Sequence, residues 1–344
     1  MREKIAVAGA GSWGTAIANL LAEKGFDVRL WVREPEVFAE IKETSENRTF
    51  LPGIKLSQNL RPFQDLGEAV EGASVVVIGA PSQYVRSVVA GLKPFMKENQ
   101  IILNIAKGIE MDTLKRMSEI VEEILPGNRY AVLSGPSHAE EVANGVPTAV
   151  VASSKSRAAA EFIQDTFMTK NFRVYTNADI VGVELGGALK NIIALGAGIV
   201  DGLGYGDNSK AALMTRGMVE MARLGAEMGA SKGTFGGLSG MGDLIVTCTS
   251  MHSRNRRAGI EIGRGRTLKD IVGETKMVIE GVANTQSAWQ LANKVGIEMP
   301  ITNEIHRVLY EEADVKESVY ALMTRSKTHE AEDIADLVSI PWGE

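Results

Sequence analysis

The chain has 344 residues, of which 44% are hydrophobic and 23% are charged. This composition is that of a folded protein, and the length suggests about two domains at roughly 150 residues each. The formal net charge of −6 argues against a general nucleic-acid-binding surface and against a broad anionic-membrane surface. A single cysteine, Cys248, excludes an internal disulfide and a thiolate metal site. We therefore expect a cytoplasmic protein that does not bind nucleic acid.

The apolar runs of the chain are short. The first, residues 5–8, is interrupted by Gly9 and Gly11 before it reaches the length that a signal peptide needs. The longest later runs, residues 75–80 and 192–200, fall well below the roughly 18 apolar residues of a membrane span. We expect no stable membrane insertion.

Short β-branched segments alternate with amphipathic segments in the first half of the chain. The predicted strands cover residues 5–8, 28–32, 75–78, 101–105, 131–133, 149–152 and 172–175. Helical spacing lies between them, at residues 15–24, 37–44, 82–92, 113–124 and 156–167. Strands that are apolar on both faces belong to a covered parallel sheet, and strand–helix alternation indicates βαβ units. Residues 1–178 are therefore predicted to form an α/β, doubly wound (Rossmann) domain.

The strand signal fades after about residue 179. Long stretches with three-to-four spacing follow, at residues 181–200, 210–228, 284–295 and 301–309. This periodicity is typical of amphipathic and buried helices. Residues 179–344 are therefore predicted to form an all-α domain.

Gly9, Gly11 and Gly14 complete a G-x-G-x-x-G pattern between the first predicted strand and the first predicted helix. In a dinucleotide-binding loop the first glycine permits the tight turn and the second lets backbone amides approach a pyrophosphate. The third lets the helix pack on the strand, and the helix N-terminus attracts the phosphates. The alternative is a glycine-rich turn without a ligand, but the strand–turn–helix context favours a dinucleotide site.

The end of the second predicted strand bears on the choice of dinucleotide. An acidic residue at this place binds the ribose 2′-hydroxyl of NAD, whereas an arginine suits the 2′-phosphate of NADP. Arg33 and Glu34 stand there side by side. The pair is a mixed signal, from which we expect NADP or NAD, with NADPH slightly favoured.

Lys190 lies inside the apolar, glycine-dotted helix predicted over residues 181–200. Burial lowers the pKa of a lysine toward the range in which it exchanges protons at neutral pH, so Lys190 is the best acid–base candidate of the chain. Asp243 follows a glycine-rich stretch and is a candidate partner for Lys190. The alternatives are a lysine that reaches solvent from a helix edge and an aspartate that caps a helix.

Two loops at the expected carboxyl edge of the sheet and one arginine cluster complete the candidates. Lys107 follows the strand at 101–105, and residues 134–138 follow the strand at 131–133. On position alone Lys107 is more simply a surface lysine, and the second loop is equally a tight turn before a helix.

Ser253, Arg254 and Asn255 have the donors of a phosphate or carboxylate clamp. The alternative is a solvated helix face, which we prefer for Arg264 and Arg266. The four histidines have no metal-ligand spacing, and Cys248 lies in an apolar run that favours a core position.

Taken together, these residues resemble a known family. The blocks that carry the resemblance are Gly9-Ala-Gly-Ser-Trp-Gly-Thr-Ala, Leu51-Pro-Gly, Ala106-Lys-Gly, Ser134-Gly-Pro-Ser, Leu189-Lys-Asn-Ile, Gly240-Met-Gly-Asp-Leu and Ser253-Arg-Asn. In this order, over residues 4–325, they are similar to the bacterial NAD(P)-dependent sn-glycerol-3-phosphate dehydrogenases of the biosynthetic type. The resemblance implies hydride transfer between NAD(P)(H) and the pair dihydroxyacetone phosphate and sn-glycerol 3-phosphate, which supplies glycerol 3-phosphate for phospholipid synthesis.

The resemblance also implies roles for individual residues. Lys190 corresponds to the proton donor and acceptor, with Asp243 and Thr247 beside it. The implied substrate contacts are Lys107, Gly135, Ser137, Lys190, Asp243, Ser253, Arg254 and Asn255. The implied cofactor contacts are Gly9, Gly11, Ser12, Trp13, Gly14, Arg33, Lys107, Ala139, Arg254, Val278 and Glu280.

Two other functions stay open from the residues. A related dehydrogenase would act on 3-hydroxy acids or phosphogluconate, although that wider group has a helical Lys-x-x-x-Asn where this chain has Lys190 directly followed by Asn191. A redox sensor would bind the dinucleotide without turnover, but it would not need Lys107, Lys190 and Asp243 at one cleft.

Glycine is unevenly distributed, with 13 glycines before residue 179 and 23 after it. We expect the excess to serve close helix packing and loop closure around Lys190 and Asp243. Glycine-rich helices also offer a face to a second subunit, which leaves a homodimer open.

Overall fold

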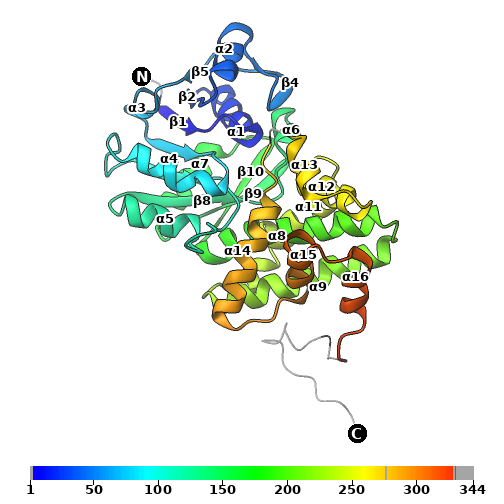
Figure 1. Cartoon of the computed structure of the whole chain (residues 1–344). Coiled ribbons are helices and arrows are strands. Elements are labelled where there is room, and N and C mark those ends of the chain that lie inside the picture. The colour runs from blue at the N-terminus through cyan, green and yellow to red at the C-terminus, as the bar shows by residue number, and fades with distance from the viewer. Residues whose placement is uncertain (1–2, 276, 328–329, 331–344) are drawn as a thin grey trace.

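The computed structural model describes residues 3–275, 277–327 and 330. Figure 1 shows two lobes, a sheet covered by helices and a bundle of helices below it. β10 ends at Asn177 and α8 begins at Ile180, close to the predicted boundary between residues 178 and 179. The outer ends of both predicted domains, residues 1–2 and 331–344, lie outside the described residues. The division into two domains stays a prediction.

The first lobe is built on an eight-stranded sheet of order β10-β9-β8-β7-β6-β1-β2-β5. Its strands are β1 (Lys4–Ala8), β2 (Asp27–Trp31), β5 (Leu60–Phe63), β6 (Val75–Ile78), β7 (Ile101–Asn104), β8 (Arg129–Ser134), β9 (Thr148–Ser153) and β10 (Phe172–Asn177). Every residue of β6 and β7 is buried, because helices cover both faces of the sheet. A separate hairpin pairs β3 (Glu46–Asn47) with β4 (Leu51–Lys55).

The prediction of a parallel sheet is wrong at one edge. β8 pairs with β9 in antiparallel orientation, whereas β9 and β10 are parallel to each other. Between β8 and β9 the chain forms one helix of five residues, α6 (Ala139–Ala143). At about 1.5 Å per residue such a helix is too short to carry the chain back along a strand of six residues, so the chain returns beside β8.

The helices of the first lobe are α1 (Ser12–Glu23), α2 (Pro35–Thr44), α3 (Leu66–Val70), the 3₁₀ turn η1 (Ser82–Tyr84), α4 (Val85–Leu92), α5 (Met117–Ile124), α6 and α7 (Arg157–Phe167). The helix predicted over residues 113–124 begins four residues later than expected. Leu114 has a φ of +59°, which a helix does not tolerate, and Glu119 accepts a hydrogen bond from the Arg116 amide in a capping box.

The second lobe is helical, as predicted. It contains α8 (Ile180–Gly202), α9 (Asp207–Glu227), α10 (Lys232–Phe235), the π-turn η2 (Leu238–Gly242), α11 (Asp243–Thr249), α12 (Arg254–Gly263), α13 (Leu268–Gly273), α14 (Glu280–Val295), α15 (Pro300–Tyr310) and α16 (Val315–Met323). Among the described helices α8 alone is long and apolar enough to cross a membrane, but 94% of its most apolar window is buried inside the protein. α8 is thus the core helix of this lobe.

Glycines bring α8 and α12 into direct backbone contact. A Cβ atom at Gly198 would lie 2.1 Å from the backbone oxygen of Arg256, and one at Gly259 would lie 2.1 Å from that of Leu195. Gly202 and Gly263 repeat this contact one turn further along. The expected close helix packing is confirmed, and these glycines are used within one chain.

A buried carboxylate joins α8 to the sheet lobe. Glu184 accepts hydrogen bonds from the Ser118 amide at 2.8 Å, the Ser118 hydroxyl at 2.6 Å and the Tyr130 hydroxyl at 2.5 Å. Arg116 pairs with it at 2.9 Å. Burial raises the pKa of Glu184, although Arg116 opposes the shift. This network fixes the N-terminal half of α8 against α5 and β8.

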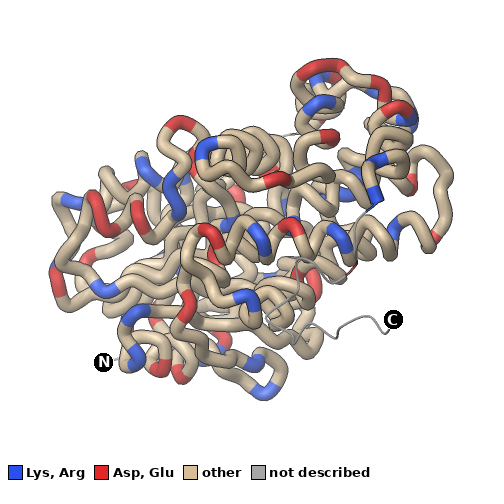
Figure 2. Tube along the Cα trace, turned by 90° about the horizontal axis from the view of Figure 1, so that it is seen from below, with Lys and Arg blue, Asp and Glu red and all other residues tan. Residues whose placement is uncertain are grey.

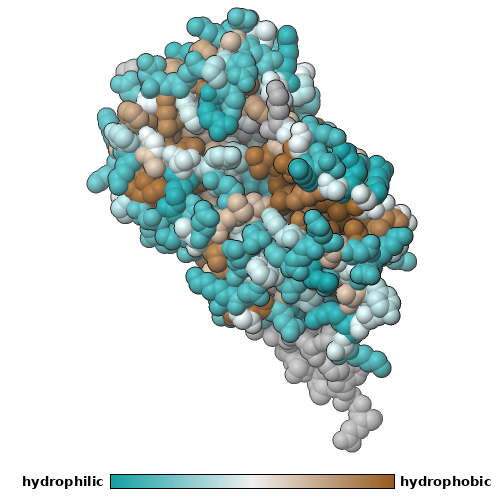
Figure 3. Space-filling view, viewed as in Figure 1, coloured by the Kyte–Doolittle hydropathy of each residue, from teal (hydrophilic) through white to brown (hydrophobic). Residues whose placement is uncertain are grey.

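Lys and Arg are interspersed with Asp and Glu along the described trace of the chain (Figure 2). Figure 3 shows apolar side chains gathered where α11 and α12 lie in Figure 1. Met241 of η2, Ile245 of α11 and Met251 between α11 and α12 are exposed, at 45%, 46% and 58%. This apolar surface borders the helix that begins with Asp243.

Candidate active site

The glycine loop after β1 has the geometry of a phosphate-binding turn. Gly9 has a φ of +127°, and a Cβ atom there would lie 2.8 Å from the backbone of Gly79. A Cβ atom at Gly14 would lie 2.1 Å from the Gly9 oxygen, so strand and helix meet without side chains. A Cβ atom at Gly11, in contrast, meets nothing within 4 Å. The first two contacts close the turn, and the third position leaves space.

α1 begins at Ser12 directly after this loop. Gly11 is its N-cap, and no side chain caps the helix. The amides of the first turn therefore have no side-chain partner and point to the open space. The positive end of the helix dipole lies at the same place. Trp13 adds a buried indole Nε1 without a hydrogen-bond partner among the described residues. Open space, free amides and an anion-attracting helix end fit the diphosphate of a dinucleotide.

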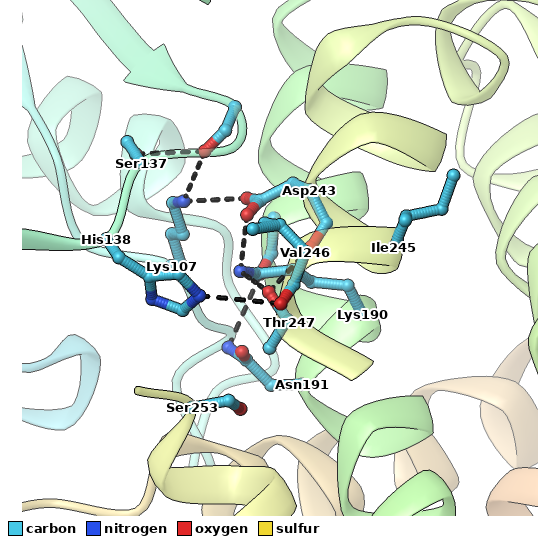
Figure 4. A network of polar contacts seen from close by, with 12 residues as sticks. Lys107, Ser137, His138, Lys190, Asn191, Asp243, Ile245, Val246, Thr247 and Ser253 are labelled. Atoms are coloured by element: carbon cyan, nitrogen blue, oxygen red, sulfur yellow. Dashed lines mark hydrogen bonds and ion pairs between the residues drawn. The ribbon is translucent and has the colours of Figure 1, made fainter. Parts of the chain in front are cut away.

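Two lysines and one aspartate meet between the lobes (Figure 4). Lys190, from the middle of α8, donates to Asp243 Oδ1 at 2.6 Å and to Thr247 Oγ1 at 2.6 Å. Lys107, from the loop after β7, donates to Asp243 Oδ2 at 2.6 Å and to the Gly135 oxygen at 3.0 Å. Asp243 thus bridges two lysines from different lobes with one oxygen each.

The position of Asp243 follows from the glycines before it. Residues 236–242 form a turn in which Gly240 packs against the Phe235 backbone, where a Cβ atom would lie 2.1 Å from the Phe235 oxygen. The tight turn starts α11 with Asp243, and Thr247 follows one helical turn later, where its hydroxyl donates to the Asp243 oxygen at 2.6 Å. Asp243 and Thr247 therefore present both partners of Lys190 from one helix face.

Burial sets the electrostatics of this cluster. It lowers the pKa of Lys190 to about 8, although the Asp243 carboxylate opposes the shift. Burial alone would raise the pKa of Asp243, but the ammonium groups of Lys107 and Lys190 outweigh it and hold that pKa below its usual range. Asp243 is therefore ionised at neutral pH, and Lys190 is poised to give and take a proton there.

The predicted clamp residues lie at the start of α12. Ser253 is the N-cap and accepts a hydrogen bond from the Arg256 amide at 3.2 Å. Asn255 donates to the side chain of Asn191 at 2.8 Å and accepts from the Gly281 amide at 2.9 Å. The guanidinium of Arg254 donates to the Val278 oxygen at 2.9 Å. The start of α12 is thereby tied to Asn191, the neighbour of Lys190, to Val278 before α14 and to Gly281 in the first turn of α14.

Comparison with known proteins places the chain. The models of the N-terminus and the C-terminus of NAD-dependent glycerol-3-phosphate dehydrogenase match residues 4–160 and 179–320. The glycerol-3-phosphate dehydrogenase (NAD(P)+) of Moorella thermoacetica is 57% identical over 333 residues, which cover 96% of this chain and 99% of that protein. The chain belongs to the NAD-dependent glycerol-3-phosphate dehydrogenase family.

Further relatives of the family agree in sequence and in fold. The glycerol-3-phosphate dehydrogenase (NAD(P)+) of Bacillus subtilis is 51% identical over 337 residues, which cover 97% of this chain and 98% of that protein. A crystal structure of glycerol-3-phosphate dehydrogenase from Coxiella burnetii matches with a TM-score of 0.92 at 40% identity, covering 94% of this chain and 99% of that chain. The expected Rossmann lobe followed by a helical lobe is confirmed.

The structure brings most of the residues that the family resemblance singles out into two groups. Lys107, Gly135, Lys190, Asp243 and Thr247 form the hydrogen-bonded cluster described above, and the Ser137 hydroxyl donates to the Gly135 oxygen at 2.9 Å. The cofactor candidates around the glycine loop adjoin Ala139, which begins α6. Arg33 follows the end of β2, where it pairs with Glu34 at 2.7 Å and its guanidinium lies 5.7 Å from the ring centre of Tyr84.

Glu280 of the helical lobe contacts the sheet lobe close to the glycine loop. This first residue of α14 accepts hydrogen bonds from the Ser82 amide at 2.9 Å and the Ser82 hydroxyl at 2.5 Å. Burial raises the pKa of Glu280, and the Ser82 contacts and Arg254 oppose the shift. Ser82 follows β6 and Gly79, which touches Gly9. The two lobes therefore meet directly beside the dinucleotide loop.

Two further residues make contacts at this cluster, and sequence reasoning assigned a role to neither. Asn284 of α14 is buried and donates to the Lys107 oxygen at 3.2 Å and to the Ala188 oxygen at 3.1 Å, and it accepts from the Ile109 amide at 3.3 Å. His138 contacts the Val246 oxygen through Nε2 at 3.4 Å. An asparagine on the apolar face of the helix predicted over residues 284–295 was an available signal for the first, since buried amides need partners.

Proposed function

We propose that this chain interconverts dihydroxyacetone phosphate and sn-glycerol 3-phosphate with NADH or NADPH, with Lys190 as the acid and base at the C2 oxygen. The observation that carries the proposal is the buried Lys190 ammonium held by Asp243 and Thr247, beside a glycine loop that suits a dinucleotide. The family matches support this substrate pair.

The reaction follows from the charges of the cluster. A bound nicotinamide supplies the hydride to C2 in the reduction and takes it back in the oxidation. Lys190, as ammonium, donates a proton to the C2 oxygen as negative charge develops there, and as amine it removes that proton in the reverse direction. Asp243 fixes the lysine and keeps it charged near neutral pH, and Lys107 supplies a second positive charge to the same oxygen.

The remaining site residues bind and orient. Arg254 and Asn255, together with Ser253, are proposed to hold the phosphate of the substrate at the start of α12. Gly135 and Ser137 border the substrate from the β8–α6 loop. Gly9, Gly11, Gly14, Ser12 and Trp13 are proposed to hold the diphosphate, with Arg33, Lys107, Ala139, Arg254, Val278 and Glu280 as further cofactor contacts. Holding both ends of the substrate lets orientation supply much of the rate.

The assay follows nicotinamide absorbance with dihydroxyacetone phosphate and each reduced cofactor in turn. We expect oxidation of both, with NADPH slightly favoured. A 3-hydroxy acid or phosphogluconate dehydrogenase would oxidise the cofactor only with its own substrates, and a redox sensor would bind the cofactor without turnover. Consumption of neither cofactor with dihydroxyacetone phosphate would refute the proposed function.

We further propose that the enzyme acts in the cytoplasm and supplies glycerol 3-phosphate to phospholipid synthesis. A homodimer stays a proposal as well. The glycines of α8 and α12 that suggested it pack within the chain, so they lend it no support. The sedimentation coefficient of the purified protein tests it, because a dimer doubles the mass of the 37.0 kDa chain.

A further inference from the structure

Glu34 and Arg33 form an exposed ion pair at the end of β2. Arg33 donates to Glu34 Oε1 through its Nε at 3.0 Å and through a terminal nitrogen at 2.7 Å. The Arg33 side chain is 65% exposed and that of Glu34 is 28% exposed. On its other side the guanidinium lies 5.7 Å from the ring centre of Tyr84, which follows β6. Arg33 is thus held between a carboxylate and an aromatic ring at the carboxyl edge of the sheet.

Both hydrogen bonds end on Oε1, which leaves Oε2 of Glu34 without a hydrogen-bond donor among the described residues. A carboxylate oxygen at this place of a dinucleotide-binding sheet accepts the ribose 2′-hydroxyl of NADH, whereas an arginine binds the 2′-phosphate of NADPH. Glu34 is also the N-cap of α2 but makes no side-chain capping hydrogen bond, so its carboxylate is not occupied by that helix. The pair therefore contains the recognition group of each cofactor.

We propose that Glu34 sets the balance between the two nicotinamide cofactors by competing with the cofactor 2′-phosphate for Arg33. This inference rests on the proposed function and names the residue that decides its cofactor. With NADH, Glu34 keeps Arg33 neutralised and accepts the 2′-hydroxyl. With NADPH, the phosphate takes Arg33 from Glu34, and the freed carboxylate lies close to the phosphate charge.

Because the pair is exposed, we expect neither cofactor to be strongly excluded. An exposed ion pair contributes little, so a 2′-phosphate displaces Glu34 at small cost. Repulsion between Glu34 and the phosphate limits the gain from the new contact to Arg33. The result is an enzyme without strong selection, in which one carboxylate holds the preference near balance.

The test is the ratio of kcat/KM for NADPH to kcat/KM for NADH, with dihydroxyacetone phosphate saturating. Glu34→Gln keeps the shape of the side chain and removes its charge, and we expect the ratio to rise roughly three- to tenfold, the range of one exposed charge pair. The matched control is Glu36→Gln, which removes a charge from the same turn of α2 at a side chain outside the Arg33 pair. We expect it to change the ratio less than about twofold.

An unchanged ratio in Glu34→Gln, or equal changes in both variants, would overturn the inference. Fluorescence titration of NADPH and NADH with the wild type and Glu34→Gln separates it from the proposed function. If the wild type oxidises neither cofactor, the proposed function fails, and the ratio of the two binding constants still decides the role of Glu34. A rise of that ratio in Glu34→Gln supports the inference, and its constancy contradicts it.

Discussion

The two lobes differ in what their glycines do and in whether they bury charged side chains. In the sheet lobe, Gly11 leaves open space at an uncapped helix end, and binding comes from backbone amides. In the helical lobe, Gly198 and Gly259 remove space so that two helices touch, and the lobe holds charged side chains in its interior. Lys190, Glu184 and Glu220 are all buried there. The difference teaches that the sheet lobe leaves space at backbone amides, whereas the helical lobe buries charged groups and so shifts their pKa values.

Lys190→Ala should have the largest effect, because it should affect turnover, which depends on the helical lobe, but not cofactor binding, which depends on the sheet lobe. It removes the proton donor but touches nothing in the glycine loop, so kcat should fall about 10³-fold while the dissociation constant of NADPH stays within about twofold. Steady-state kinetics and fluorescence titration measure the two. Lys269→Ala, at an exposed lysine of α13, is the control and should change neither. Near-normal turnover of Lys190→Ala would contradict the role of Lys190 of the helical lobe as acid and base.

Asp243→Asn tests whether the buried anion keeps both lysines in place. Without it, Lys107 and Lys190 lose their shared partner, and the pKa of Lys190 falls further because burial is no longer opposed. We expect kcat of the reduction at neutral pH to fall about 10²-fold. Loss of one partner of a buried pair should also lower the free energy of unfolding by about 3 kcal/mol, measured by urea denaturation. Wild-type stability together with wild-type turnover would show that Asp243 carries neither role.

Gly198→Ala and Gly11→Ala form a matched pair for the two uses of glycine. At Gly198 the new methyl group meets a backbone oxygen, and the free energy of unfolding should fall by about 2 kcal/mol or more. At Gly11 the methyl group enters open space, so stability should change little while NADPH binding weakens at least about tenfold. Urea denaturation measures the free energy of unfolding of both variants, and fluorescence titration measures their dissociation constants for NADPH. Equal stability of the two variants would contradict the contrast between the lobes.

Glu220→Gln gives the last expected effect, a stability change whose size depends on pH. Glu220 accepts hydrogen bonds from the amides of Ile301 and Thr302, and burial raises its pKa from the ordinary 4.5 to about 7. The folded state therefore binds this proton more tightly than the unfolded state. The stability from Glu220 is full below pH 4.5 and is lost as the pH rises through 7.

The glutamine keeps the neutral form at every pH. The stability of Glu220→Gln relative to wild type should therefore rise by about 2.5 kcal/mol between pH 5 and pH 8, since the pKa of Glu220 changes from 4.5 in the unfolded state to about 7 in the folded state. Urea denaturation of both proteins at several pH values measures the difference, in which the titration of all other groups cancels. A difference that is constant over this range would show that Glu220 does not titrate as inferred.

Local patterns in the sequence predict much of this architecture. The strand and helix around Gly9 and Gly11 follow from apolar periodicity and a glycine pattern within a few residues. The helix that buries Lys190 follows from its composition, and the structure confirms that this lysine is buried. These features are local, so the chain around them suffices to specify them.

The parts that sequence reasoning missed depend on distant contacts. The antiparallel turn at β9 follows from the short α6, whose length the sequence pattern did not fix. The contacts of Asn284 join residues 96 and 177 positions away. Asp243 was expected beside Lys190, but its second bond, to Lys107, depends on how the lobes meet. Such pairings require the fold, because spacing along the chain carries no information about them.

The most direct test of the central claim is the pH at which kcat/KM breaks in each direction of the reaction. With Lys190 at a pKa of about 8, reduction of dihydroxyacetone phosphate should be constant below that pH and fall tenfold per pH unit above it. Oxidation of glycerol 3-phosphate should rise up to the same pH and then level off. A shared break near pH 8 is the predicted result. Profiles that continue between pH 7 and pH 9 without a break would contradict Lys190 as the acid and base.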